Sequence, residues 1–353
     1  LIKSLPLLSC KTSLSFGKGL GVRSFNYFKT HHIMKFFFSC DWGTSTFRLR
    51  LVDAENIKVL SEIKTRHGIA IAFESWKQTN QQEKTRLAFY QTYLFEQVKK
   101  ITVPFNDAVK DAPIILSGMA SSSIGMIELP YKEIPFPCKG SGLVIYIIPA
   151  DEDHRHKMIM ISGARTDVDV IRGEETMLAG CKISEDDSEQ LFIFPGTHSK
   201  HIIVKNGLVK NITTYMTGEL FDLLSNKSIL SASVKKDDPE PTGSNRFFID
   251  GVLKGRASIL SNSIFHVRTN HLFKKTTPGE NYDYLSGLLI GHELKDVSAN
   301  KPPSITLVCS EGLKKSYTQA LNVLELASQV NYENADEALI NGQWIITQQL
   351  GYL

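Results

Sequence analysis

Two stretches of this chain share one layout, and that layout restricts the folds open to it. In each stretch an apolar strand leads to a tight turn of glycine and hydroxyl residues, and a second strand follows. The first runs through residues 36–40, 41–46 and 46–52, and the second through residues 191–194, 195–200 and 201–205. Asn206 and Gly207 then predict a type I′ hairpin into residues 208–213. Because no long sequence repeat accompanies the layout, we expect two halves related in structure only.

Elsewhere short strand-like runs alternate with longer helix-like runs, which is typical of α/β domains. We expect a first lobe over residues 34–187, joined by a C-terminal helix at about 335–353, and a second lobe over residues 188–334. The polar tract 184–190 is the expected hinge. Further strands are expected at 113–116, 144–149 and 305–308, and helices at 83–100, 173–183, 282–294, 313–321 and 336–350.

Residues 1–33 differ from the rest of the chain. Residues 1–40 carry six Lys or Arg and no Asp or Glu, which leaves 34 basic against 37 acidic residues in the remainder. We interpret 1–33 as a misplaced start or an added leader before Met34, with a targeting segment or a structured arm as alternatives. In the rest of the chain, basic and acidic residues are interleaved along the sequence, which argues against a basic surface that binds nucleic acid.

Hydropathy and cysteine usage exclude two further classes of protein. Across the 353 residues no apolar run reaches the roughly 18 residues that a membrane-spanning helix needs. The five cysteines are scattered and form no CxxC pair, so neither a zinc ribbon nor a disulfide framework is expected. A reducing cytoplasm is therefore the expected compartment.

Both turns are candidate phosphate cradles, since glycine permits close approach of the backbone and hydroxyls add hydrogen-bond donors. In the first, Asp41 ends a strand, where its carboxylate can hold Mg²⁺ through water. A plain hairpin turn is the alternative there, and in the second turn a structural histidine and a solvated lysine are the alternatives. The candidate phosphate-binding residues are Gly43, Thr44, Ser45 and Thr46 in the first turn and Gly196, Thr197, His198, Ser199 and Lys200 in the second.

Between the turns lies the densest group of charges, over residues 167–176. If Gly173 begins a helix, Glu174 and Glu175 lie in its first turn, where the helix dipole favours ionised carboxylates. Stabilisation of that helix is one reading of these acids. The other is a general base for a substrate hydroxyl, because the segment joins the two phosphate-cradling halves. Glu174 and Asp169, both on this segment, are the candidates for the base.

Five blocks in order resemble the 2-dehydro-3-deoxygalactonokinase family: residues 41–45, 171–176, 195–200, 217–220 and 285–291. The similarity covers residues 36–353. It implies the actin, hexokinase and Hsp70 architecture, in which two ribonuclease H-like α/β lobes close over ATP and substrate. It also implies ATP-dependent transfer of a phosphoryl group to the 6-hydroxyl of 2-dehydro-3-deoxy-D-galactonate in galactonate breakdown.

The resemblance also implies roles for particular residues. Local similarity to the glycine-acid step of related sugar kinases favours Glu174 over its rival Asp169 as the base. Residues near Gly287, Ser310 and Gly312 would border the adenosine, with Gly312 standing in for a glycine that such kinases usually carry just after the preceding strand. Because the implied substrate is a carboxylate, an arginine is expected in its pocket. Arg172 is our candidate, and Glu175 is the second predicted substrate-binding residue. A plain ion pair of Arg172 with Asp169 or Glu175 is the alternative.

Two alternatives stay open. One is a kinase of the same architecture for another sugar or sugar acid. The other is a nucleotide-driven switch protein, since actin and Hsp70 use such lobes without phosphorylating a small molecule. The expected partners are ATP, Mg²⁺ and a small sugar acid, with no nucleic acid and no membrane. A homo-oligomer is left open.

Overall fold

The computed structural model describes residues 35–79, 85–152, 154–185, 187–236, 246–349 and 351. All the described residues belong to one compact unit. The segment 1–33, for which we predicted a leader, lies outside the described residues, as does Met34.

The first sheet has six strands in the order β3-β2-β1-β4-β8-β7. Strands β1 to β3 form an antiparallel meander, β4 and β8 run parallel to β1, and β7 is an antiparallel edge. Alternate residues of β1 enter different cores: Phe38, Cys40 and Trp42 pack with helices α1 and α2, and Phe37 packs on the opposite side. The bounds are β1 Phe36–Trp42, β2 Phe47–Asp53, β3 Lys58–Thr65, α1 Ile69–Lys77, α2 Arg86–Thr102, β4 Ile114–Gly118, β7 Ile145–Ile148 and β8 Met158–Ile161.

The second sheet has the order β15-β14-β11-β12-β13-β6. Its order β13-β12-β11-β14-β15 matches the order β3-β2-β1-β4-β8 of the first sheet. Strands β11, β12 and β13 form an antiparallel meander, and β14 and β15 run parallel to β11. Asn206 and Gly207 have φ of 53° and 68°, the two positive values that a type I′ turn needs. The bounds are β6 Phe136–Pro137, β11 Gln190–Phe194, β12 Ser199–Lys205, β13 Leu208–Tyr215, β14 Ser304–Cys309 and β15 Val330–Asn334.

Two helices, α3 (Glu174–Gly180) and α11 (Ala335–Gln349), share one apolar core with residues of both sheets. They touch through glycines: a Cβ on Gly180 would lie 1.9 Å from the carbonyl oxygen of Ala338, and one on Gly342 would lie 1.7 Å from that of Thr176. We predicted a helix as far as residue 183, but α3 ends at Gly180, and Cys181 is already extended.

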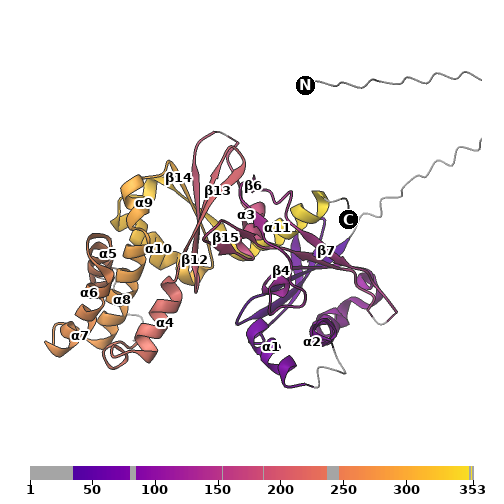
Figure 1. Cartoon of the computed structure of the whole chain (residues 1–353), viewed down its shortest axis with the longest axis horizontal. Coiled ribbons are helices and arrows are strands. Elements are labelled where there is room, and N and C mark those ends of the chain that lie inside the picture. The colour runs from indigo at the N-terminus through magenta and orange to yellow at the C-terminus, as the bar shows by residue number, and fades with distance from the viewer. Residues whose placement is uncertain are drawn as a thin grey trace, which may run out of the picture. The chain divides into compact units, whose positions relative to one another are not determined.

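Most remaining helices follow the second sheet's meander, and Figure 1 shows α5, α6, α7 and α8 gathered together beside α4. Only α8 and α10 in this group were expected from the sequence. A small sheet of β5, β9 and β10 leads the chain into α3. The bounds are α4 Thr217–Lys227, α5 Arg246–Ala257, α6 Leu260–Ser263, α7 Phe265–Leu272, α8 Pro278–Glu293, α9 Lys295–Asn300, α10 Glu311–Val323, β5 Lys132–Glu133, β9 Ala164–Arg165 and β10 Val170–Ile171. Four 3₁₀ segments among the described residues span Val103–Val109, Met119–Ser121, Ser231–Ser233 and Ala327–Gln329.

Candidate functional site

The first predicted phosphate turn joins β1 to β2. Trp42 is buried and its indole N–H donates to the His67 carbonyl oxygen at 3.0 Å, which fixes the end of β1. The Gly43 N–H donates to the Thr46 carbonyl oxygen at 2.9 Å and closes the turn. Thr44, Ser45 and Thr46 are exposed. The turn therefore offers hydroxyls and backbone to solvent on a rigid base, although its binding of phosphate stays a prediction.

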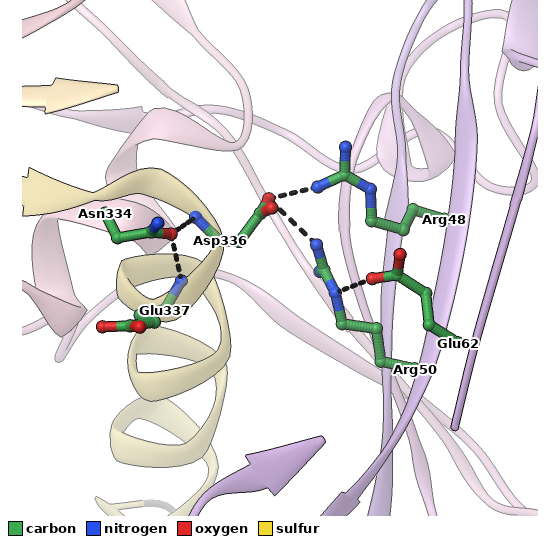
Figure 2. A network of polar contacts seen from close by, with 6 residues as sticks. All are labelled: Arg48, Arg50, Glu62, Asn334, Asp336 and Glu337. Atoms are coloured by element: carbon green, nitrogen blue, oxygen red, sulfur yellow. Dashed lines mark hydrogen bonds and ion pairs between the residues drawn. The ribbon is translucent and has the colours of Figure 1, made fainter. Parts of the chain in front are cut away.

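Asp41, the predicted metal ligand, is partly buried at the end of β1. Burial raises the pKa of its carboxyl, Arg48 and Arg50 counteract that rise, and Asp336 adds to it. Figure 2 shows the neighbouring network, with Asp336 between the guanidinium groups of Arg48 and Arg50 and with Glu62 on Arg50.

The second predicted turn joins β11 to β12. Thr197 and His198 are exposed, whereas Ser199 and Lys200 are buried as the first residues of β12. The His198 imidazole contacts the carboxylate of Glu219 in α4. The structure thus places two blocks of the family pattern, residues 195–200 and 217–220, against one another.

A buried carboxylate, Glu293 at the end of α8, holds the start of β12. It accepts hydrogen bonds from Ser199 Oγ at 2.6 Å, His201 Nε2 at 3.0 Å and Tyr317 Oη at 2.7 Å. Thr217 Oγ1 is a fourth donor, at 2.5 Å. Burial favours a higher pKa for Glu293, but the hydrogen bonds and charge of His201 and the bonds from Ser199 and Thr217 lower the pKa below its ordinary value.

Two glycines bring the start of α3 to the end of β1. Gly118, with φ of 79°, pairs with Trp42, and a Cβ on it would lie 3.4 Å from Asp41 Oδ1. Gly173, with φ of 114°, lies against Gly118, since its own Cβ would be 3.5 Å from the Gly118 Cα. Both φ values are unfavourable for any residue with a side chain. Glu174 follows directly.

Glu174, the predicted base, is within electrostatic reach of both turns. Burial raises the pKa of its carboxyl, the charge of Lys200 lowers it, and the charge of Asp41 raises it. One carboxylate oxygen accepts the Arg172 backbone N–H at 3.0 Å, and the side chain keeps partial exposure. A carboxyl with a raised pKa and partial exposure suits proton transfer.

The neighbouring Glu175 faces the protein interior. It is fully buried, and its two oxygens accept the Gly173 N–H at 2.9 and 2.8 Å. Burial, together with the charge of Glu174, raises the pKa of Glu175 to about 7. This geometry favours a role in capping α3, and its predicted contact with substrate stays a prediction.

Asp169, the rival base, holds β13. One oxygen accepts the Thr214 backbone N–H and the other accepts the Val170 N–H, each at 2.7 Å, and the Thr214 hydroxyl also donates to the carboxylate. With both oxygens engaged, Asp169 is suited to fixing the small sheet to β13, which leaves Glu174 as the stronger candidate for the base.

Arg172, the predicted carboxylate ligand, is held in place by two residues that we did not predict. Its guanidinium carbon lies 4.2 Å from the ring centroid of Tyr131, and one terminal nitrogen donates to Ser121 Oγ at 2.6 Å. The Arg172 Nε–H is buried and has no acceptor among the described residues. Such an orphaned donor is what a bound carboxylate would satisfy.

The three residues predicted near adenosine lie in two environments. Gly287 is buried in the contact of α8 with α5, where a Cβ would lie 2.1 Å from the Phe248 carbonyl oxygen, so helix packing already accounts for this glycine. Ser310 and Gly312 are exposed at the start of α10, directly after β14, and a Cβ on Gly312 would meet nothing within 4 Å. Of the three, Ser310 and Gly312 remain open to a ligand.

In the described part of the chain, no three or more His, Cys, Asp or Glu side chains gather so that they could hold a metal ion, and every helix is too short or too polar to span a bilayer. Mg²⁺ on a nucleotide commonly needs only one or two protein carboxylates. The partly buried Asp41 beside exposed hydroxyls fits that arrangement.

Sequence reasoning missed Ser121, Tyr131, Gly118 and Glu293. The first three lie between the predicted elements, where no local pattern marks them. Glu293 ends a predicted helix rich in apolar residues, and a lone acid in that position was a usable signal.

Comparison with known proteins gives one consistent result. The sequence model of the 2-keto-3-deoxy-galactonokinase family matches residues 41–346. A Rhizobium meliloti (strain 1021) protein to which 2-dehydro-3-deoxygalactonokinase activity is ascribed is 32% identical over 312 residues, which are 87% of this chain and 95% of that protein. The 2-dehydro-3-deoxygalactonokinase of Escherichia coli (strain K12) is 31% identical over 226 residues, 60% of this chain and 71% of the other.

A solved structure agrees with the sequence relatives. A crystal structure from Sinorhizobium meliloti, of a protein to which the same activity is ascribed, superimposes with a TM-score of 0.74 at 30% identity, covering 90% of this chain and all of that one. The two predicted ribonuclease H-like α/β halves are confirmed by the repeated sheet order. This chain therefore belongs to the 2-keto-3-deoxy-galactonokinase family.

Proposed function

We propose that this protein transfers the γ-phosphoryl group of ATP to the 6-hydroxyl of 2-dehydro-3-deoxy-D-galactonate, a step of galactonate breakdown. Family membership supports the reaction class and the substrate. The observation that carries the proposal is the position of Glu174 at the start of α3, which the contact of Gly173 with Gly118 brings to the end of β1 beside Asp41. The charge of Lys200 in the other turn also acts on its carboxyl.

The transfer forms a bond from the 6-oxygen to the γ-phosphorus and breaks the bond from that phosphorus to the ADP oxygen. Glu174 accepts the proton of the attacking hydroxyl. Its raised pKa makes it a stronger base than an ordinary glutamate, while the charge of Lys200 keeps the carboxylate available. Phosphoryl transfer needs little covalent help, so alignment of the two substrates contributes most of the acceleration.

The phosphate side of the reaction falls to the two turns. The exposed hydroxyls of Thr44, Ser45 and Thr46 and the exposed Thr197 and His198 supply donors to phosphate oxygens. A Cβ on Gly43 would meet protein atoms only at an ordinary 3.5 Å, and one on Gly196 only at 3.9 Å. The protein itself leaves this space open, as close approach of a phosphate requires. Asp41 would hold Mg²⁺, which when bound neutralises charge on the triphosphate.

The sugar acid is held at its carboxylate. Arg172 presents the orphaned Nε–H, and Tyr131 and Ser121 fix its guanidinium in one orientation. An arginine whose rotamers are already restricted loses less entropy when it binds an anion, which favours acidic over neutral sugars.

A kinase for another sugar acid is the competing assignment, and a nucleotide-driven switch is the more distant one.

The four described cysteines, Cys40, Cys138, Cys181 and Cys309, are buried free thiols, as expected in a reducing compartment. We propose that the enzyme works in the cytoplasm.

A coupled assay for ADP release over a panel of sugar acids tests the proposal. We expect release with the galactonate-derived keto acid at a kcat/KM at least about 10-fold above that for its gluconate epimer, since one well-placed polar contact is worth about that factor. Equal rates with both epimers would contradict the substrate, and no acid-dependent release would contradict the kinase assignment.

A further inference from the structure

Gly68 and Gly218 lie under the two phosphate turns, at the starts of helices α1 and α4. A Cβ on Gly68 would lie 2.3 Å from the Thr44 carbonyl oxygen and 2.4 Å from the Ser45 carbonyl carbon. One on Gly218 would lie 2.5 Å from the Gly196 carbonyl oxygen and 2.9 Å from the Thr197 Cα. A side chain at either position would therefore collide with the backbone of the turn above it.

The helix starts bind the carbonyl groups of the turns. The Ile69 and Ala70 N–H groups donate to the carbonyl oxygens of Gly43 and Thr44 at 2.9 and 3.1 Å. The Glu219 N–H donates to the Thr197 carbonyl oxygen at 2.9 Å. These bonds satisfy helix N–H groups that otherwise lack partners in the first turn of a helix.

Peptide geometry converts these bonds into an orientation of the turns. In a trans peptide the C=O of one residue and the N–H of the next point in opposite directions. Carbonyls directed at α1 and α4 therefore turn the N–H groups of Thr44, Ser45 and His198 away from the helices. Outward-facing amides in a short turn are the donors that a phosphate cradle needs.

The device occurs twice at equivalent points of the fold. In both halves the chain runs through a strand, a turn, two further strands and then a helix whose start returns beneath that turn: β1, β2, β3 and α1, or β11, β12, β13 and α4. In each half a glycine, Gly68 or Gly218, lies where the start of the helix contacts the turn.

We propose that Gly68 and Gly218 are positioning residues of the kinase, which set the depth and amide orientation of the two phosphate turns by admitting the helix starts beneath them. The inference rests on the proposed function only in taking ATP as the ligand of the turns. A purely structural role is the alternative, since other glycines of this chain pack as tightly.

Gly255 provides the matched control. It lies in the contact of α5 with α8, where a Cβ would be 2.1 Å from the Leu288 carbonyl oxygen, which is a collision as severe as that at Gly68. Gly255→Ala should therefore lower thermal stability without touching either turn.

The experiment compares wild type, Gly68→Ala, Gly218→Ala and Gly255→Ala. For each protein the melting temperature, kcat and the KM values for ATP and for the keto acid are measured. We expect the first two variants to raise the KM for ATP about 10- to 100-fold, the cost of one or two weakened charge-assisted hydrogen bonds, with the KM for the acid within about 2-fold. Gly255→Ala should melt earlier but keep both KM values.

Calorimetric binding of Mg·ATP, expressed per folded molecule at low temperature, covers a variant that folds poorly and does not depend on the identity of the acid. Weaker binding by Gly68→Ala and Gly218→Ala, but not by Gly255→Ala, supports the inference. If the wild type phosphorylates no acid in the panel, that result contradicts the proposed function and leaves the inference standing. Wild-type affinity for Mg·ATP in both turn variants, alongside lowered melting temperatures, would overturn it.

Discussion

Glu174 and Glu175 are chemically identical neighbours in the first turn of α3, yet their surroundings differ. Glu174 is partly exposed, and the charges of Lys200 and Asp41 both act on the pKa of its carboxyl. Glu175 is fully buried against the Gly173 N–H and the Thr176 hydroxyl. Because successive residues of a helix point in different directions, Glu174 is suited to catalysis and Glu175 is suited to capping the helix.

Glu174→Gln should fold normally and lose about two to four decades of kcat, because an amide cannot accept the proton of the attacking hydroxyl. Since the pKa of Glu174 is raised, the wild-type kcat should fall with decreasing pH at a pH above the ordinary range of a glutamate. The kcat against pH for both proteins measures this. Near-wild-type turnover in the variant would remove Glu174 from the role of base.

Glu175 should make stability depend on pH. Its folded pKa of about 7 lies above its ordinary value of 4.5, so its contribution to stability is complete below pH 4.5 and is lost as the pH rises through 7. Glu175→Gln lacks this titration, so its free energy of unfolding relative to wild type should rise over that interval by at most about 3 kcal/mol. Urea unfolding across pH measures it, with the exposed Glu185→Gln as the control. A flat difference would contradict the buried titration.

At the scale of elements, the second phosphate turn depends on partners from three helices. Glu293 in α8 binds Ser199 at the start of β12, Thr217 in α4 and Tyr317 in α10. Residues of three helices therefore anchor Ser199, the residue that directly follows the turn.

Glu293→Gln should lower the free energy of unfolding by about 1–3 kcal/mol, because the amide presents two donors to hydroxyls that need an acceptor. Tyr317→Phe removes one donor and should cost less. Chemical denaturation of both variants checks the order. A Glu293→Gln protein as stable as wild type would show that the buried network contributes little.

Gly312→Ala tests the predicted border of the adenosine. The position is open space in the first turn of α10, so alanine should stabilise the folded protein by about 0.5–1 kcal/mol through its higher helix propensity. If Gly312 borders the nucleotide, the added methyl group should also raise the KM for ATP. Unchanged KM with the expected gain in stability would place the adenosine elsewhere.

At the scale of the whole described unit, Asp336 joins the two sheets. It lies at the start of α11, directly after β15 of the second sheet, and contacts Arg48 and Arg50 of β2 in the first sheet (Figure 2). Asn334 caps α11 by accepting the Asp336 N–H at 2.9 Å and the Glu337 N–H at 3.2 Å, which holds Asp336 in place.

Asp336→Asn should lower the free energy of unfolding by about 1 kcal/mol, since the buried Arg50 loses one of its two acidic partners while the exposure of Asp336 to solvent limits the loss. It should also lower the pKa of Asp41, because Asp336 is one of the charges that raise it. Thermal melts against the exposed Glu337→Gln control measure the first effect. Equal melting temperatures for the two variants would contradict the joining role.

The sequence alone determined the two strand-turn-strand units, the hairpin at Asn206 and Gly207, the α/β class and the family. Each of these follows from neighbouring residues: alternation of apolar side chains, turn residues with permitted φ, and short blocks in order.

Only the tertiary structure decided that Glu175 caps α3, that Asp169 fixes β13, that Gly287 packs α8 on α5, and that Glu293 holds the second turn. Those roles depend on which distant segments meet and on which way each helix is rotated. Such contacts arise when the cores of both sheets close, because an enclosed polar group without a partner is costly and most such groups pair with whatever the chain brings near them.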